Sequence, residues 1–489
     1  LGARPRDLRL ALLVANLVLA VLGAAVGLGI AALSRGALVS YASRFTLRAQ
    51  EVGIDWRVAG VTFAAAVAVA VALAWLPGAV STSRVASAAA RSTQGRARKR
   101  MQRGLVVAQL ALSFALLAGS GLLVRTLLNL LAVDPGFRVE NVLTLEAVGG
   151  GAGAITPEAL FTDVLETARA LPGVRHAAVA SWAPLTGRST VGFDVSVVGR
   201  PESAPQSITL AFNAVSGEYF DALEMRLVDG RFFEETDRAG AERVVILGRS
   251  MARTLFGDAS AIGEQIVISF PGSSNAPPPS RVVGVVSDTR EHGLQTTGAH
   301  TVYAPARQAN WGPTVLVVTA GEPTSVIKAI ADRIHALDPD RPVDRIRTMR
   351  ELRAAEVAPT RLNATLFGGF ALLALLIAAV GVLGVMAFSV GRRTREFGVR
   401  MALGEARGAL LRNVLGEGLA MAGVALLAGG GGAFLLGRLL AGLLYGVEPL
   451  DMSTLAAAAG LLAAATALAA FFPALRATRV DPRDVLETA

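Results

Sequence analysis

Arginine and apolar side chains alternate through residues 391–412, a short segment between two long apolar runs. These side chains are better suited to binding a partner protein than to catalysing a reaction. Apolar side chains can fill a groove on the partner, and charged side chains can fix the register of the segment in that groove. The alternative is a solvated connector whose arginines only set the orientation in the membrane. The apolar members are Phe397, Val399, Met401, Leu403 and Leu410, and the basic members are Arg392, Arg393, Arg395, Arg400, Arg407 and Arg412.

Residues that could catalyse a reaction form no recognisable group. The sequence has no GxxxxGK[ST] phosphate loop, so we expect this chain not to hydrolyse ATP itself. It has no cysteine, and its four histidines lack metal-ligand spacing. The glycine run 429–432 lies in an apolar stretch and indicates helix packing or a local break. We therefore predict no catalytic residue, no metal site and no cofactor-binding residue.

The composition predicts a polytopic α-helical membrane protein. Of 489 residues, 53% are hydrophobic and only 17% are charged, which is too apolar for a soluble protein of this length. Six apolar runs are long enough to cross a bilayer at about 20 residues per crossing. These predicted spans are residues 10–33, 58–76, 104–124, 362–390, 415–440 and 455–472.

The net charge is +9, and the basic residues cluster beside the apolar runs, as the positive-inside rule describes. This pattern does not indicate nucleic-acid binding. Basic clusters at 81–103, 391–412 and 476–483 fit the cytoplasmic side together. Glu417 then lies at the cytoplasmic start of the fifth span, where it is either interfacial or paired with a neighbouring span.

Residues 133–360 differ in composition and predict an inserted extracytoplasmic α+β domain. Alternating apolar runs predict strands at 142–145, 191–198, 207–212, 244–247, 265–269, 281–286 and 315–319. Helices are predicted at 157–171, 218–223, 250–256 and 323–337.

The ends of the two outermost span pairs resemble each other. Residues 75–85 and 472–480 both end an apolar helix at proline and continue with small residues and arginine. We therefore expect a C-terminal fragment of a duplicated protein. The predicted divisions are the last two spans of a first unit (1–80), a basic cytoplasmic linker (81–103), a first span (104–132), the outer domain (133–360) and a three-span permease domain (361–489).

With Arg395-Glu-Phe-Gly-Val-Arg-Met-Ala-Leu-Gly404 after the span 362–390, the chain resembles the MacB/FtsX-type ABC transporter permeases. Phe472-Pro-Ala-Leu-Arg-Ala-Thr-Arg-Val-Asp-Pro482 resembles that family's closing motif. The outer domain is similar to the MacB-like periplasmic core domain through Gly230-Arg-Phe-Phe and Val282-Val-Gly-Val-Val-Ser-Asp288. Val133-Asp-Pro-Gly-Phe137 points to the duplicated, orphan permease branch.

This resemblance implies a membrane subunit of an ABC-type transporter in the bacterial inner membrane. ATP would bind only to a cytoplasmic ABC ATPase dimer, whose hydrolysis would drive motion of the outer domain in efflux or mechanotransmission. A periplasmic adaptor or a second permease unit are further candidate partners. The implied ATPase-coupling residues are Arg395, Glu396, Phe397, Arg400, Met401, Leu403 and Gly404.

Two other functions stay open at this point. One is an FtsX-like scaffold or signalling protein that regulates an extracytoplasmic enzyme. The other is an orphan permease whose outer domain binds a ligand without any ATPase. A neighbouring ATPase gene would favour the transporter, and a hydrolase with a coiled-coil partner would favour the scaffold.

Overall fold

The computed structural model divides the chain into two compact units, residues 1–129 with 358–489, and residues 130–357. The residues that the structure describes are 5–43, 53, 55–81, 90–147, 157–186, 190–199, 206–271, 277–296, 300–309, 313–403 and 405–478.

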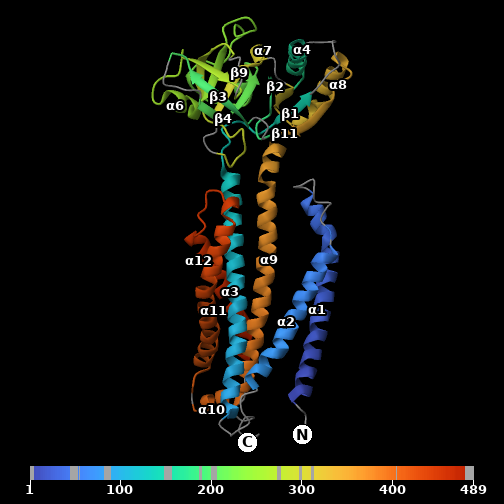
Figure 1. Cartoon of the computed structure of the whole chain (residues 1–489), viewed down its shortest axis with the longest axis vertical. Helices are drawn as coiled ribbons and strands as arrows, with labels where there is room; N and C mark the ends of the chain where they lie inside the picture. Colours follow the sequence, from blue (N-terminus) through green and yellow to red (C-terminus); the bar gives the residue numbers. More distant parts are fainter. Residues whose placement is uncertain are drawn as a thin grey trace. The chain divides into compact units, whose positions relative to one another are not determined.

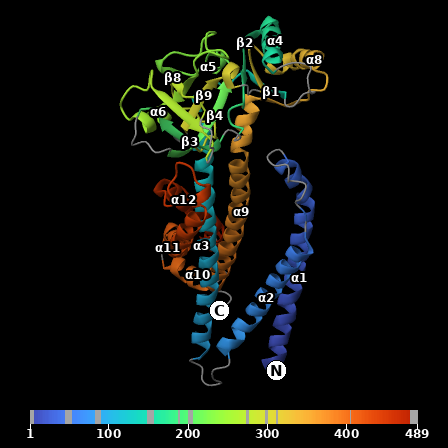
Figure 2. The ribbon, with the colours of Figure 1, turned by 45° about the horizontal axis from the view of Figure 1, so that its top comes forward.

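The first unit is built from helices (Figures 1 and 2). Among the described residues, five helical stretches are long and apolar enough to cross a membrane. The second predicted span, 58–76, falls in α2, where the described apolar part, Trp56–Val71, is shorter. The polytopic helical class is therefore confirmed. The helices are α1 (Pro5–Ala42), α2 (Trp56–Ser81), α3 (Ala90–Ala132), α9 (Met349–Arg392), α10 (Thr394–Ala402), α11 (Arg407–Leu439) and α12 (Met452–Thr478).

Small residues bring the helices of this unit close together. A Cβ atom on Gly429 of α11 would lie 2.7 Å from the Ala111 carbonyl oxygen of α3, so the two backbones are in contact there. A Cβ atom on Gly432 would lie 3.3 Å from the Cβ of Ala115. Close backbone approach of this kind replaces the hydrophobic drive that helices lack inside a bilayer. The packing interpretation of the glycine run is confirmed for these two positions.

The second unit contains one sheet that serves two lobes. In the first, which we call the open-sheet lobe, four antiparallel strands follow the order β11-β1-β10-β2. Two helices pack on this sheet through buried side chains such as Leu160 and Ile330. The elements of this lobe are β1 (Val142–Ala147), α4 (Pro157–Ala170), β2 (Val174–Ala180), β10 (Thr314–Thr319), η2 (Pro323–Val326), α8 (Ile327–Leu337) and β11 (Val343–Thr348).

The second lobe is a closed barrel. Its strands pair in the order β4-β3-β7-β8-β6-β9, and a parallel pairing of β9 with β4 closes the ring. The enclosed core includes Leu210, Leu247 and Met251. The barrel lobe contains β3 (Thr190–Val197), β4 (Gln206–Val215), α5 (Tyr219–Ala222), β5 (Leu227–Gly230), β6 (Val244–Gly248), α6 (Arg249–Phe256), β7 (Gln265–Ser269), β8 (Ser280–Val286), β9 (His300–Pro305) and α7 (Ala306–Ala309).

Gly230, at the end of β5, shows why one motif needs glycine. Its φ is +78°, and a Cβ atom there would lie 2.2 Å from the Val283 carbonyl oxygen of β8. A side chain is therefore excluded both by the backbone conformation and by the space. The motif Gly230-Arg-Phe-Phe is thus a structural feature of the barrel.

The strand ladder between the lobes is narrow. Strands β2 and β4 pair only at Ala180 and Val215. Two further backbone hydrogen bonds flank this pair, from Ser181 N to the Ala214 oxygen and from Ser216 N to the Val179 oxygen, both at 2.9 Å. The chain leaves the open sheet after β2 and returns in β10, which is paired with β2 along its length. The barrel lobe is therefore an insertion between two neighbouring strands of the open-sheet lobe.

All seven predicted strands and all four predicted helices of the outer domain are confirmed. The sequence interpretation missed β2, β5, β9 and β11. Strand β11 is largely exposed and carries Asp344, Arg345 and Arg347, so it lacks the apolar alternation of a half-buried strand.

Candidate functional site

The predicted coupling segment, 391–412, contains the end of α9, the short helix α10 and the start of α11. The backbone departs from helical geometry at Arg393, which has φ −107° and ψ 8°. Thr394 Oγ1 donates to the Gly391 oxygen at 3.0 Å, which satisfies one of the carbonyl groups at the end of α9. The chain therefore turns once before α10, and it turns again at Leu403 before α11 begins.

One face of α10 belongs to the core of the helical unit. Phe397 is only 5% exposed and belongs to a buried cluster with Leu410, Ala470 and Ala474. Met401, one helical turn later, is half-buried against the same cluster. Residues four positions apart share a helix face, so Phe397 and Met401 anchor α10 to its own unit.

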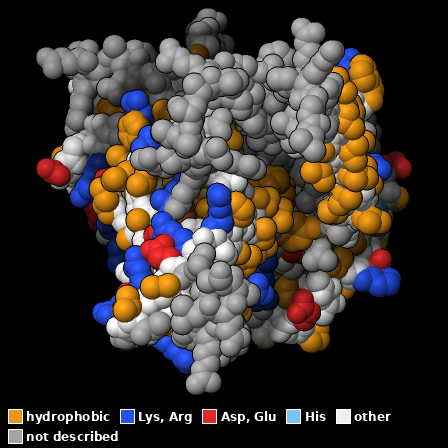
Figure 3. Space-filling view, turned by 90° about the horizontal axis from the view of Figure 1, so that it is seen from below, with side chains coloured by type: hydrophobic (Ala, Val, Ile, Leu, Met, Phe, Trp, Pro, Cys, Tyr) orange, Lys and Arg blue, Asp and Glu red, His pale blue; other side chains and the backbone are white. Residues whose placement is uncertain are grey.

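The opposite face of α10 is open. Glu396, Val399, Arg400 and Leu403 follow the i, i+3, i+4, i+7 spacing of one helix face, and all four are exposed. Leu403 is 83% exposed. We call these four residues the exposed α10 face. In Figure 3, basic side chains lie among hydrophobic ones on the described surface at the end of the molecule that carries α10.

Charges on the exposed α10 face are paired within the segment. Arg400 Nη2 donates to Glu396 Oε1 at 2.5 Å, and Arg400 also lies 4.0 Å from Glu405. Both members of the Glu396–Arg400 pair are about half exposed, so their pair stabilises the helix by only about 0.3–0.5 kcal/mol. This charge pair remains accessible to a partner.

Five of the seven predicted coupling residues are divided between these two faces. Glu396, Arg400 and Leu403 lie on the exposed α10 face, and Phe397 and Met401 lie on the anchoring face. The side chain of Arg395 and the whole of Gly404 lie outside the described residues. Val399, which the prediction of docking residues omitted, completes the exposed α10 face.

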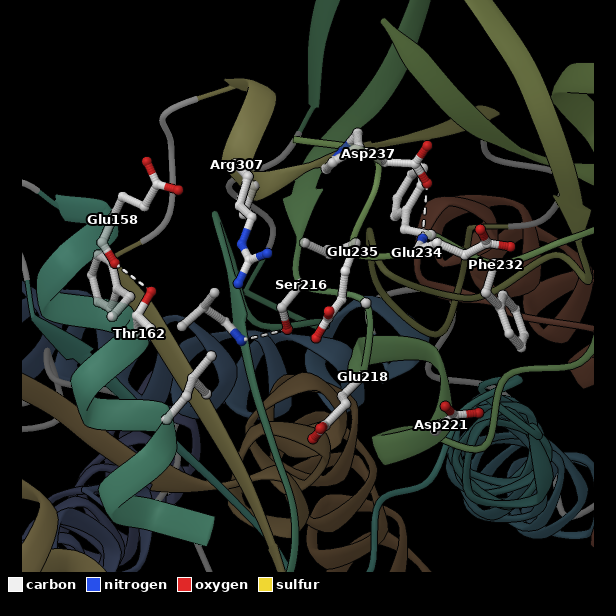
Figure 4. Close-up of a pocket in the computed structure, with 18 of the residues that line it drawn as sticks. Glu158, Thr162, Ser216, Glu218, Asp221, Phe232, Glu234, Glu235, Asp237 and Arg307 are labelled. Atoms are coloured by element: carbon white, nitrogen blue, oxygen red, sulfur yellow. Dashed lines mark hydrogen bonds between the residues drawn. The ribbon is translucent and has the colours of Figure 1, made fainter. Parts of the chain in front are cut away.

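A pocket of about 550 Å³ lies between α4 of the open-sheet lobe and α7 of the barrel lobe (Figure 4). Phe161, Phe232 and Phe233 contribute apolar surface, and the Arg307 guanidinium points into the pocket. Arg169 and Glu218 form a 3.1 Å ion pair between the two lobes at its edge. The acidic lining residues are Glu158, Glu166, Glu218, Asp221, Glu234, Glu235 and Asp237.

Acidic residues outnumber arginines in this lining, which favours cationic groups in the pocket. The charge of one of these acids is balanced by an arginine: Asp237 accepts hydrogen bonds from Arg231 Nη1 at 2.8 Å and from Glu234 N at 2.8 Å. Burial alone would raise the pKa of Asp237, but these bonds and the charge of Arg231 outweigh burial and lower that pKa. Asp237 thus shapes the pocket wall as an ionised, fixed group.

A second polar cluster is buried in the outer domain. Glu291 Oε1 accepts hydrogen bonds from Tyr303 OH at 2.8 Å and from Tyr219 OH at 3.1 Å. Asn213 Nδ2 lies 3.4 Å from Tyr219 OH, and Thr289 Oγ1 lies 3.2 Å from Tyr303 OH. Burial raises the pKa of the Glu291 carboxyl, and the hydrogen bonds from the tyrosines offset this only in part. This cluster joins α5, β4 and β9 with the loop after β8.

Comparison with known families identifies both units. A family described as "MacB-like periplasmic core domain" matches residues 104–337, and one described as "FtsX-like permease C-terminal" matches residues 368–482. The chain belongs to the MacB/FtsX-type ABC transporter permeases. It is therefore a multi-pass protein of the inner membrane, and its outer domain is a periplasmic core domain inserted between membrane helices.

Individual relatives of this MacB/FtsX-type permease are distant. The "Macrolide export ATP-binding/permease protein MacB 1/2" of Paracoccus denitrificans is 26% identical over 77% of this chain and 56% of its own length. The "Pyoverdine export ATP-binding/permease protein PvdT" of Pseudomonas aeruginosa is 26% identical over 54% of this chain and 40% of its own length. The chain thus spans about half the length of the curated relatives it matches.

Among solved structures, the periplasmic region of MacB from Actinobacillus actinomycetemcomitans matches 46% of this permease and 96% of that chain, with 18% identity and a TM-score of 0.32. Helix α9 begins directly after β11 of the periplasmic core domain and leads along the chain into α10.

Proposed function

We propose that this permease couples ATP hydrolysis by a cytoplasmic ABC ATPase dimer to motion of its periplasmic domain. In this proposal the exposed α10 face is the docking surface for the ATPase. ATP binds only to that partner, and the permease transmits force. The five domain divisions expected from the sequence are part of this proposal, with 391–412 as the coupling segment.

The observation that carries the proposal is the division of α10 into two faces. A merely solvated connector has no need of an apolar side chain as exposed as Leu403. A helix that inserts into a groove needs both an apolar contact and charges that set its register. Leu403 and Val399 supply the first, and Glu396 and Arg400 supply the second. Phe397, held in the core, prevents α10 from moving independently of its unit.

Helix α9 connects α10 to the periplasmic domain and would transmit motion between them. This helix runs for 44 residues, from the end of β11 in the periplasmic domain to the turn before α10. A displacement of α10 is therefore passed along one continuous helix. The two relatives are named as exporters, and we extend export to this chain as part of the proposal. A periplasmic adaptor and a second permease unit would complete the assembly.

Crosslinking from Val399 tests the proposal directly. Since the chain has no cysteine, a single cysteine introduced as Val399→Cys can carry a photoactivated crosslinker in native membranes. We expect an ABC ATPase to be captured, because Val399 lies on the exposed α10 face and is 43% exposed. Mass spectrometry of the adduct identifies the partner.

Leu427→Cys is the matched control for this experiment. Leu427 is 84% exposed in the middle of α11, where lipid surrounds an apolar helix. It should capture no ATPase. Efficient labelling at Val399 without an ATPase adduct would contradict the docking role and support the scaffold or orphan alternative. Labelling of Val399→Cys only by a reagent applied from the periplasm would contradict the topology.

A further inference from the structure

Glu417 joins three helical elements through one carboxylate. It lies in the third turn of α11, and each of its oxygens accepts a different guanidinium. Arg103 Nη2 of α3 donates to Oε2 at 2.6 Å, and Arg393 Nη1 donates to Oε1 at 2.8 Å. Glu417 is therefore paired with neighbouring elements, which decides between the two interpretations left open by the sequence.

The position of Arg393 places this cluster where α9 meets α10. Arg393 is the residue between the last residue of α9 and the first of α10, so it forms the corner from which α10 projects. Arg103 belongs to α3, the helix that leads along the chain into β1 of the periplasmic domain. The carboxylate of Glu417 thus links the base of α10 to α3.

Both arginines depend on Glu417. The three side chains are about one-third exposed, at 36% for Arg103, 38% for Arg393 and 31% for Glu417, so water screens the pairs only in part. Arg103 Nε is buried, and within the described residues it has no hydrogen-bond partner. Without Glu417, two guanidinium groups held near one another would repel, and each would lose its charge-assisted bond.

The other attachment of α10 is apolar. Phe397 packs in a buried cluster that contains Leu410 of α11, Ala470 of α12 and Val106 of α3. Loss of the Glu417 cluster should therefore leave α10 and α3 packed in the bundle, while the corner at Arg393 is no longer tied to Arg103 of α3. The expected defect is one of transmission, with folding largely preserved.

We propose that Glu417 is a positioning residue that clamps the base of α10 to α3, so that displacement of α10 moves α3 as well as α9. The inference rests on the proposed coupling function for its purpose. The clamp itself is a property of the permease alone. It can therefore be tested without any partner.

Distances between spin labels test the clamp in the full chain, reconstituted in nanodiscs without ATPase. Labels are attached at Val399→Cys of α10 and Leu105→Cys of α3, which are both exposed. We expect one narrow distance distribution in the parent and a clearly broadened one with Glu417→Gln. The released population should rise about fivefold to tenfold, as expected when two partly exposed pairs are lost together. Glu448→Gln, an exposed glutamate in the loop before α12, is the matched control and should change nothing.

A second label pair separates a loosened clamp from a damaged bundle. Labels at Leu112→Cys of α3 and Leu427→Cys of α11 report helix packing away from the clamp and should be unaffected by Glu417→Gln. If Glu417→Gln does not fold, Arg393→Gln removes only the α10 side of the clamp and should broaden the Val399–Leu105 distances alike. Unchanged Val399–Leu105 distances in a folded variant would overturn the proposal.

The stimulation of the ATPase by the permease is a further measurement. It would not change if Glu417 had only a structural role. With the ATPase captured at Val399 as the probe, Glu417→Gln should leave its binding intact and remove most of its stimulation by the permease. If the ATPase binds and stimulation stays at the parent level, the clamp has no part in transmission. If the parent itself captures no ATPase, the proposed function fails, while the distance measurements still decide whether the clamp exists.

Discussion

Glu291→Ala should destabilise the periplasmic domain by about 3–5 kcal/mol, since it combines a cavity with unsatisfied buried groups. The carboxylate accepts bonds from Tyr219 OH and Tyr303 OH, and all three side chains are buried. Removing a shared acceptor leaves two hydroxyl donors short of a partner, at about 1–3 kcal/mol each. Thr289 Oγ1 can accept from Tyr303 OH and so reduces this cost, whereas the Asn213 amide only donates to Tyr219 OH and gives that hydroxyl no new acceptor.

The variant Glu291→Gln distinguishes the hydrogen-bond acceptor at position 291 from the titratable carboxyl group, because it keeps the first and removes the second. Its amide oxygen can still accept from both tyrosines, so this variant should stay folded. Burial holds the pKa of Glu291 above its ordinary value of 4.5, so the folded domain binds that proton more tightly than the unfolded chain does. Stability from this group is fully present below pH 4.5 and is lost as the pH rises through the raised pKa, by at most about 1.4 kcal/mol per pH unit. The glutamine variant should lack this loss.

Fluorescence of Trp182 can follow both variants. Its indole Nε1 donates to the Phe212 oxygen at 3.0 Å, beside Asn213 of the polar cluster. Urea unfolding of the full chain with its other tryptophans replaced by phenylalanine gives the free energy of unfolding at each pH. Glu158→Gln, an exposed glutamate of α4, is the control. An alanine variant as stable as the parent, or a glutamine variant with the parent's pH dependence, would refute this account of the cluster.

Glu396→Lys should reduce stimulation of the partner ATPase at least about tenfold, because a reversed charge at a docking interface costs several kcal/mol. The carboxylate of Glu396 lies on the exposed α10 face, 47% exposed, and its neighbour Phe397 keeps the helix anchored. Membrane insertion should therefore be unchanged. The measurement is the ATPase rate of the reconstituted complex with parent and variant permease at equal amounts.

The Glu396–Arg400 pair provides its own control. The double variant Glu396→Lys, Arg400→Glu restores an opposite-charge pair at the same i, i+4 spacing, and so restores the local support of α10. It leaves the charge pattern presented to the partner reversed. We expect the double variant to remain defective. Full recovery would mean that Glu396 acts only through helix stability, and normal stimulation by the single variant would remove Glu396 from the docking surface.

Local patterns predicted the spans and most of the periplasmic domain. Uninterrupted apolar runs gave the helices, and alternation gave the seven strands. The four missed strands lack that signal, since β5 is short and β11 is charged. The closed barrel depends on β9 pairing parallel to β4, more than 80 residues earlier in the chain. No short-range pattern encodes such a pairing.

The sequence predicted where the candidate coupling segment lies, but not which side chains of α10 are buried. The spacing of Glu396, Val399, Arg400 and Leu403 marks one side of a helix, and this signal was available in the sequence. The burial of Phe397 was not, because it is created by α12, which lies more than 50 residues further along the chain. The Glu417 cluster is still less local, since Arg103 lies 314 positions away from it.

The pairing of β1 with β11 limits how the periplasmic domain can be driven. Strand β1 follows α3 along the chain, and β11 runs directly into α9, so both connections to the membrane enter through neighbouring, hydrogen-bonded strands. Arg353 of α9 also donates to the Leu131 oxygen at the end of α3 at 2.8 Å. Sliding α3 lengthwise past α9 would shear this ladder and break several backbone hydrogen bonds at once. We therefore expect α3 and α9 to move together along their axes. Motion of one helix relative to the other should be a tilt or a twist.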